Sequence, residues 1–186
     1  MLVWVVLIAL VLYVIVTYNS LVSIKHHVEK AWANIDVLLK QRNDELPKLI
    51  DTCKVYMAHE ASTLEKVIQA RMGVDAARQM HDVSGLSKAE SALTTSLGGL
   101  FAVAENYPDL KADQTFLNLQ HRITGLENQI ADRREFYNDS VNNNNVRIQQ
   151  FPDMLVASVF NFERAELLKF SADELKDIDV SERFNR

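Results

Sequence analysis

Apolar residues are unevenly distributed along the chain, and the first 24 positions contain no Asp, Glu, Lys, Arg or His. A helix rises about 1.5 Å per residue and a hydrocarbon core is about 30 Å thick, so positions 2–22 are long enough to cross a membrane. Trp4 and Tyr18 lie near the two ends, where aromatic rings favour the interface. The pattern predicts a transmembrane anchor over residues 1–24.

A cleaved signal peptide is the alternative interpretation of this segment. Signal peptides carry basic residues before the apolar run and an Ala-x-Ala cleavage site after it. Neither feature is present here. We therefore expect an uncleaved, single-pass anchor.

After the anchor, apolar positions recur every three or four residues, as in a helix that is buried on one side. The first seam runs to Leu38 without a helix-breaking residue, so this helix is expected to leave the membrane uninterrupted. A second seam continues from Leu46 to Ile68 and contains Pro47. There the helix either kinks or begins again, with Asn43 or Asp44 as its cap.

Three further helices follow in the pattern. Turn signals at 80–87 precede a seam over 86–104, which stops near Tyr107-Pro108-Asp109. A longer seam runs from Phe116 to Val141 and is weakened by the asparagines at 142–145. Beyond Phe151-Pro152, a shorter helix is expected from Met154 to about Phe170.

These elements predict an all-α protein, in which the transmembrane helix continues into an up-and-down bundle of long antiparallel helices. The predicted parts are an anchor over residues 1–24, a bundle over 25–170 and a charged, disordered tail over 171–186.

Composition narrows the function. The 186 residues include 20 Lys and Arg against 25 Asp and Glu, a net charge of −5 that argues against nucleic acid as a partner. One cysteine excludes a disulfide framework and a multi-cysteine metal site. No phosphate-binding or nucleophile motif is present. We expect no cofactor, no metal and no catalytic activity.

One pair of residues keeps an enzyme open as the alternative. His59 and Glu60 begin the metalloprotease pattern H-E-x-x-H, but Thr63 stands where the second histidine is needed. Adjacent side chains on a helix also diverge by about 100°. The alternative is therefore a metal-dependent or acid–base hydrolase that uses His59 with Glu60 or Glu105.

Other candidates favour structure or interaction. Trp32, Asp36 and Arg42 lie within three turns of the first helix. Each can pair across helices with Glu127, Arg133 or Arg134, because long bundles use buried polar contacts to set register. Tyr107 and Pro108 form a rigid corner that could also bind a partner. The candidate interaction residues are Trp32, Asp36, Arg42, Tyr107, Pro108, Glu127 and Tyr137.

Several blocks of the chain resemble the LemA family of bacterial membrane proteins. They include AWANIDVLLKQR at 31–42, ENYPDLKA at 105–112, LENQIA at 126–131, and Phe151-Pro152 followed by VASVF at 156–160. The resemblance implies a membrane-anchored helical bundle with no established catalytic residues. The sequence departs from the family pattern at three positions: Asn144 stands for the usual Tyr, Asn161 for Gly and Glu45 for an apolar residue.

Together these features predict a structural or assembly protein of the bacterial inner membrane. Its partners are expected to be the lipid bilayer, further copies of the chain through an apolar stripe from Leu21 to Leu38, and a possible membrane protein. Lys25, Lys30 and Lys40 follow the span and no basic residue precedes it, which favours an outside N-terminus and a cytoplasmic body. The alternative is a periplasmic or extracellular body.

Overall fold

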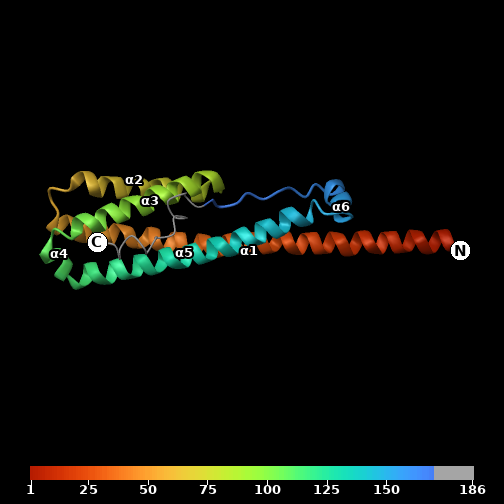
Figure 1. Ribbon diagram of the computed structural model, residues 1–186, viewed down its shortest axis with the longest axis horizontal. Helices are drawn as coiled ribbons and strands as arrows, with labels where there is room; N and C mark the ends of the chain where they lie inside the picture. Colours follow the sequence, from red (N-terminus) through yellow and green to blue (C-terminus); the bar gives the residue numbers. More distant parts are fainter. Residues whose placement is uncertain (170–186) are drawn as a thin grey trace, which may run out of the picture. The chain divides into compact units, whose positions relative to one another are not determined.

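A computed structural model describes residues 1–169 as helices and short connections, with no strand within that range. The all-α prediction is confirmed. The predicted tail at 171–186 lies outside the described residues. Figure 1 shows the elements in order, which are α1 (Leu2–Tyr56), α2 (Ala61–Gln79), α3 (Val83–Ala104), α4 (Pro108–Ala112), α5 (Gln114–Arg147) and α6 (Asp153–Val159).

The α1 helix leaves the apolar span without interruption, as predicted. It also continues through Pro47, so neither Asn43 nor Asp44 begins a new helix. Proline inside a helix costs about 3 kcal/mol because it removes one hydrogen bond and crowds the preceding turn. Leu46 and Leu49 flank it and are fully buried, each contributing about 1.5–3 kcal/mol. Burial on both sides of the proline thus outweighs its cost.

The predicted seam from Leu46 to Ile68 is not one helix. The α1 helix ends at Tyr56 and α2 begins at Ala61, although no Gly or Pro stands between them. Met57 remains fully buried, and its amide still donates to the Cys53 carbonyl at 2.8 Å. The chain turns immediately after this buried residue, so the apolar spacing conceals the break.

The contacts divide the chain into two compact units, one of residues 1–44 and 121–167, the other of residues 45–120 with the described residues from 168. The α1 and α5 helices each contribute to both. This division follows contacts and leaves the predicted anchor at 1–24 and bundle at 25–170 as a prediction.

In the second unit, α2 and α3 pack side by side (Figure 1). The turn between them lies within the segment predicted at 80–87. Asp82 caps α3 by accepting a hydrogen bond from the Gly85 amide at 2.8 Å. A side chain at Gly85 would begin 2.2 Å from a carboxylate oxygen of Asp82, so the capping carboxylate would have to move to accommodate one. The buried residues of α2 and α3 include Leu64, Val67, Val74, Leu86, Leu93, Leu97 and Leu100.

In the first unit, α5 runs antiparallel to α1 with a constant register. Arg42 forms an ion pair with Glu127, and Trp32 packs against Tyr137. From the first contact to the second, α1 runs ten residues toward its N-terminus while α5 runs ten residues toward its C-terminus. Of the two arginines named as candidate partners on α5, Arg134 is buried and Arg133 is exposed.

The last helix is shorter than predicted: α6 covers Asp153–Val159, and no helix continues toward residue 170 in the described part of the chain. Asn161 has a φ of 54°, and the Phe162 amide donates to the Ala157 carbonyl at 2.9 Å. This closure ends a helix with a left-handed residue, a position that favours glycine. The usual Gly of the family at this position therefore has a conformational reason.

Candidate functional site

The sequence candidates on α1 and α5 lie at helix contacts of the first unit. An Nη atom of Arg42 lies 3.8 Å from a carboxylate oxygen of Glu127, and the arginine side chain is 2% exposed. The rings of Trp32 and Tyr137 meet edge to face with centroids 5.6 Å apart. Asp36 lies half-buried on α1 between Trp32 and Arg42. The Arg42–Glu127 and Trp32–Tyr137 contacts join α1 to α5.

Tyr137 also contacts the segment that follows α6. Its hydroxyl donates to the Glu166 carbonyl at 2.9 Å. Burial, with a further contribution from the Glu166 charge, raises the pKa of Tyr137 to about 12. The phenol is therefore protonated at neutral pH and acts as a donor, so Tyr137 fixes the backbone of this segment.

Tyr107 and Pro108 lie in the second unit, where the chain passes from α3 to α5. Pro108 is the first residue of α4, and the Tyr107 hydroxyl donates to a Glu60 carboxylate oxygen at 3.2 Å. Nearby, the Tyr56 hydroxyl donates to Asp113 at 2.9 Å. Two tyrosine–carboxylate bonds thus tie this corner to the end of α1 and to the α1–α2 connection.

Asp113 is the charged centre of this corner. Its other carboxylate oxygen accepts the Phe116 amide at 2.9 Å. That amide, followed by the Tyr56 hydroxyl, lowers the pKa of Asp113 below its ordinary value. The same carboxylate raises the pKa of Tyr56. Asp113 therefore links the start of α5 to α1 as an anion.

The residues of the alternative hydrolase are engaged elsewhere. Glu60 accepts the Tyr107 hydroxyl and Glu105 pairs with Lys111, while His59 lies exposed in the α1–α2 connection. Within residues 1–169, no group of three or more His, Cys, Asp or Glu side chains could hold a metal ion. Cys53 is fully buried, and burial raises the pKa of its thiol to about 11.

A second polar cluster, which the sequence analysis missed, lies beside the apolar half of α1. The Tyr13 hydroxyl donates to Asp153 at 3.0 Å, and Arg147 forms an ion pair with the same carboxylate. Next to it, Tyr18 packs against Phe160 and Phe162, with ring centroids 4.7 and 5.8 Å away. We call these residues the membrane-side joint. The joint holds the end of α5 and α6 against the apolar span.

An open groove of about 550 Å³ lies next to the joint. Tyr18, Phe160 and Phe162 line it together with charged side chains. Apolar and charged groups therefore meet in one hollow beside α1. The charged and titratable residues of its lining are Lys25, His26, Glu29, Glu163 and Arg164.

The asparagines at 142–145 do not end α5, which continues to Arg147. Asn145 donates to the Ala165 carbonyl and accepts the Ala165 amide, both at 2.9 Å. Asn144 is buried and donates to the Glu163 carbonyl at 3.4 Å. These side chains form hydrogen bonds with the backbone of a segment that has no secondary structure. Asn145 thus supplies the two hydrogen bonds that a neighbouring strand or helical turn would otherwise give to Ala165.

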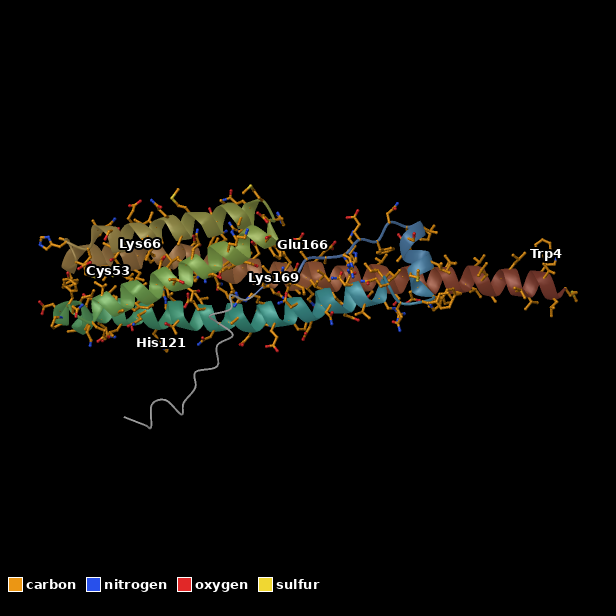
Figure 2. The ribbon with its side chains drawn as sticks, turned by 45° about the horizontal axis from the view of Figure 1, so that its top comes forward. Trp4, Cys53, Lys66, His121, Glu166 and Lys169 are labelled. Carbon is orange, nitrogen blue, oxygen red and sulfur yellow. The ribbon has the colours of Figure 1, made fainter. Side chains whose placement is uncertain are left out.

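The N-terminal end of α1 has no other part of the described chain packed against it. Residues 2–12 are exposed on every side, and Figure 2 shows Trp4 on this stretch, beyond α6. Among the described helices, α1 alone is long and apolar enough to cross a membrane. The fold and these contacts define a helical protein with one candidate membrane-spanning helix at its N-terminus.

The chain belongs to the LemA family, whose profile matches residues 31–181. It is similar to Protein LemA of Metamycoplasma hominis, with 28% identity over 90% of this chain and 75% of that protein. It is also similar to Magnetosome protein MamQ 1 of Paramagnetospirillum magneticum, with 24% identity over 86% of this chain and 67% of the relative. Magnetosome protein MamQ of Magnetospirillum gryphiswaldense is 22% identical over the same shares.

Asn145→Ala is expected to lower the free energy of unfolding by about 1–3 kcal/mol, because it leaves the amide and carbonyl of Ala165 without their partner. Asn143→Ala is the matched control, since Asn143 is exposed on the same helix and has the same helix propensity. Denaturant unfolding followed by circular dichroism measures both, and amide exchange at Ala165 reports the local effect. Equal stabilities of the two variants would contradict this role.

Asp113→Asn is expected to reduce stability more at neutral pH than in acid. Because the folded pKa of Asp113 is lowered, its contribution is present above the ordinary aspartate pKa of about 3.9 and is lost as the pH falls through the folded pKa. The difference from wild type should therefore shrink in acid. Asp139→Asn, at an exposed position of α5, serves as the control. A difference that does not change with pH would refute the assignment.

Proposed function

We propose that this chain is a single-pass protein of the bacterial inner membrane whose helical body has a structural or assembly role and no catalytic activity. One observation carries the proposal: α1 runs unbroken from a bare apolar stretch at residues 2–12 into a body whose polar clusters join helix to helix. Three curated relatives are named for the magnetosome, a cell structure, and none of the relatives' names states a reaction.

Acid–base hydrolysis is not part of this proposal. It would need His59 to work with Glu60 or Glu105, and both carboxylates are bound to other side chains. Cys53 is buried with a protonated thiol, which makes a poor nucleophile. The Glu60 and Glu105 carboxylates are therefore used in contacts that hold the fold together.

Self-association belongs to the proposal, but through a different surface from the one the sequence suggested. Along the stripe from Leu21 to Leu38, Leu21, Ala31 and Ile35 are each only 1% exposed. The chain itself buries these three positions and covers Ile24, Val28 and Leu38 in part. The exposed surface of the span is the remaining apolar face of α1, and a membrane confines copies of it to a high effective concentration.

Light scattering of the full chain in detergent, with the detergent mass subtracted, is expected to give at least twice the 21.2 kDa chain mass. Ala9→Leu should reduce that mass, because helices in a membrane approach each other most closely at small residues. Ala33→Leu, exposed on the body part of α1, is the matched control. A mass near 21.2 kDa for the wild type would exclude self-association, and a mass unchanged in Ala9→Leu would exclude the span contact.

The body is proposed to face the cytoplasm, because Lys25, Lys30 and Lys40 follow the span. In intact cells, an impermeant thiol reagent should label Leu2→Cys and leave Val55→Cys unlabelled, although Val55 is 75% exposed. Unmodified protein provides the background, since Cys53 is fully buried. Labelling of Val55→Cys alone would place the body outside the cytoplasm.

A further inference from the structure

An exposed apolar patch surrounds α6. It consists of residues from α6 and its two ends, and we call it the α6 patch. Its side chains are exposed by between 44% and 74%, although they are large and apolar. Contiguous exposed apolar surface of this kind marks a site of contact with a protein or a membrane. The residues of the patch are Phe151, Met154, Leu155, Val159 and Phe160.

The α6 patch lies beside the apolar part of α1. Asp153 is bonded to Tyr13, and Phe160 packs on Tyr18. Val156 and Ala157, on the same short helix, share a buried cluster with Leu21. In Figure 1, α6 accordingly stands against α1, which continues past it to the N-terminus. The patch is therefore continuous with the exposed apolar surface of the span.

The length of the uncovered span decides how deep this patch lies. Residues 2–12 number eleven, which at about 1.5 Å each gives about 16 Å. A hydrocarbon core is about 30 Å thick, so the bare stretch crosses only about half of it. The apolar segment reaches a full thickness only if it continues to about residue 22, within the charge-free stretch that ends at Ile24. The end of α5 and α6 lie beside that second half.

The charged groups of this turn are paired with each other. The Asp153 side chain is 9% exposed and interacts with the Tyr13 hydroxyl and with Arg147, whose side chain is 40% exposed. The amides of Met154 and Phe160 donate to backbone carbonyls within the turn. Paired charges and internally bonded backbone are what a segment needs in order to enter a low-dielectric layer.

Apart from the Asp153–Arg147 pair, charged residues of both signs line the groove on the body side of the patch. They are Lys25, Glu29, Glu163 and Arg164, next to Tyr18, Phe160 and Phe162. Aromatic rings favour the membrane interface, and basic side chains favour the phosphate level beyond it. Along α1, the contacts with α6 at Tyr13 and Tyr18 therefore come before the charged groove at Lys25, which is the order of apolar, aromatic and charged groups across a bilayer leaflet.

We propose that the α6 patch is a second membrane contact, seated in the leaflet on the body side of a phospholipid bilayer beside the span. The chain then contacts the membrane at two places, the span of α1 and the α6 patch beside it. An apolar element at this boundary is typically immersed by about 5–10 Å. The inference rests on the proposed single-pass anchoring, and the experiment tests the two separately.

Depth measurement by spin labelling tests the contact on the full chain in vesicles of phosphatidylethanolamine and phosphatidylglycerol. Single cysteines are placed at Leu155 in the patch, at Val11 in the span and at Val37 on the body, whose exposed fractions are 56%, 56% and 55%. Equal exposure means that differences in collision rates report the surroundings. Unmodified protein controls for the buried Cys53, and circular dichroism checks that each variant keeps its helices.

At Leu155 we expect the ratio of collisions with oxygen to collisions with a water-soluble nickel chelate to exceed the ratio at Val37 several-fold and to approach that at Val11. A water-like ratio at Leu155 with a lipid-like ratio at Val11 would overturn the patch contact and leave the anchor intact. Water-like ratios at both would overturn the anchor itself. A Leu155 label that meets neither agent and shows spin–spin broadening would assign the patch to a second copy of the chain and overturn the lipid contact.

Discussion

The antiparallel contact between α1 and α5 determines how far the end of α5 reaches along α1, and so where α6 can lie. Arg42 sets that register, because its side chain is 2% exposed and its ion-pair partner is Glu127. A slip of one helical turn, about 5.4 Å, would separate the buried guanidinium from this carboxylate. Removing one partner of a buried pair costs about 3–5 kcal/mol, so the pair selects one register among several that apolar packing alone would permit.

The membrane-side joint follows from that register. With Arg42 beside Glu127 and Trp32 beside Tyr137, α5 ends close enough to Tyr13 for Asp153 to accept its hydroxyl. The asparagines of α5 then reach the returning segment at Glu163 and Ala165. A contact in the body thus decides which part of the apolar span has protein beside it and which part is left bare.

Helix content and core faces could be predicted from the sequence because they depend on local spacing. The seams over 86–104 and 116–141 correspond to α3 and to most of α5. The end of α1 at Tyr56 could not be predicted, because the buried Met57 continues the apolar spacing although the chain turns there. The short α6 escaped for the same reason: apolar residues continue past Asn161, whose left-handed backbone ends the helix.

The partners of the candidate site residues could be predicted only where few residues could serve as partners. Glu127 stood among three possible partners of the α1 side chains, but spacing alone does not give the register that selects it. The bonds of Asn145 join residues twenty positions apart, and Tyr13 lies 140 positions from Asp153. No local pattern connects such residues. An asparagine that weakens a helix locally can therefore be the residue that organises a distant segment.

The 140-residue separation of Tyr13 and Asp153 has a consequence for biosynthesis. At about 5–20 residues per second, a ribosome needs about 7–28 s after Tyr13 to produce its partner. During that time the apolar half of α1 is complete while α6 does not yet exist. Under the proposed anchoring, the span therefore reaches the membrane bare, as a simple apolar helix. The turn that covers its second half can be added only afterwards, so assembly of the joint follows synthesis of the whole body.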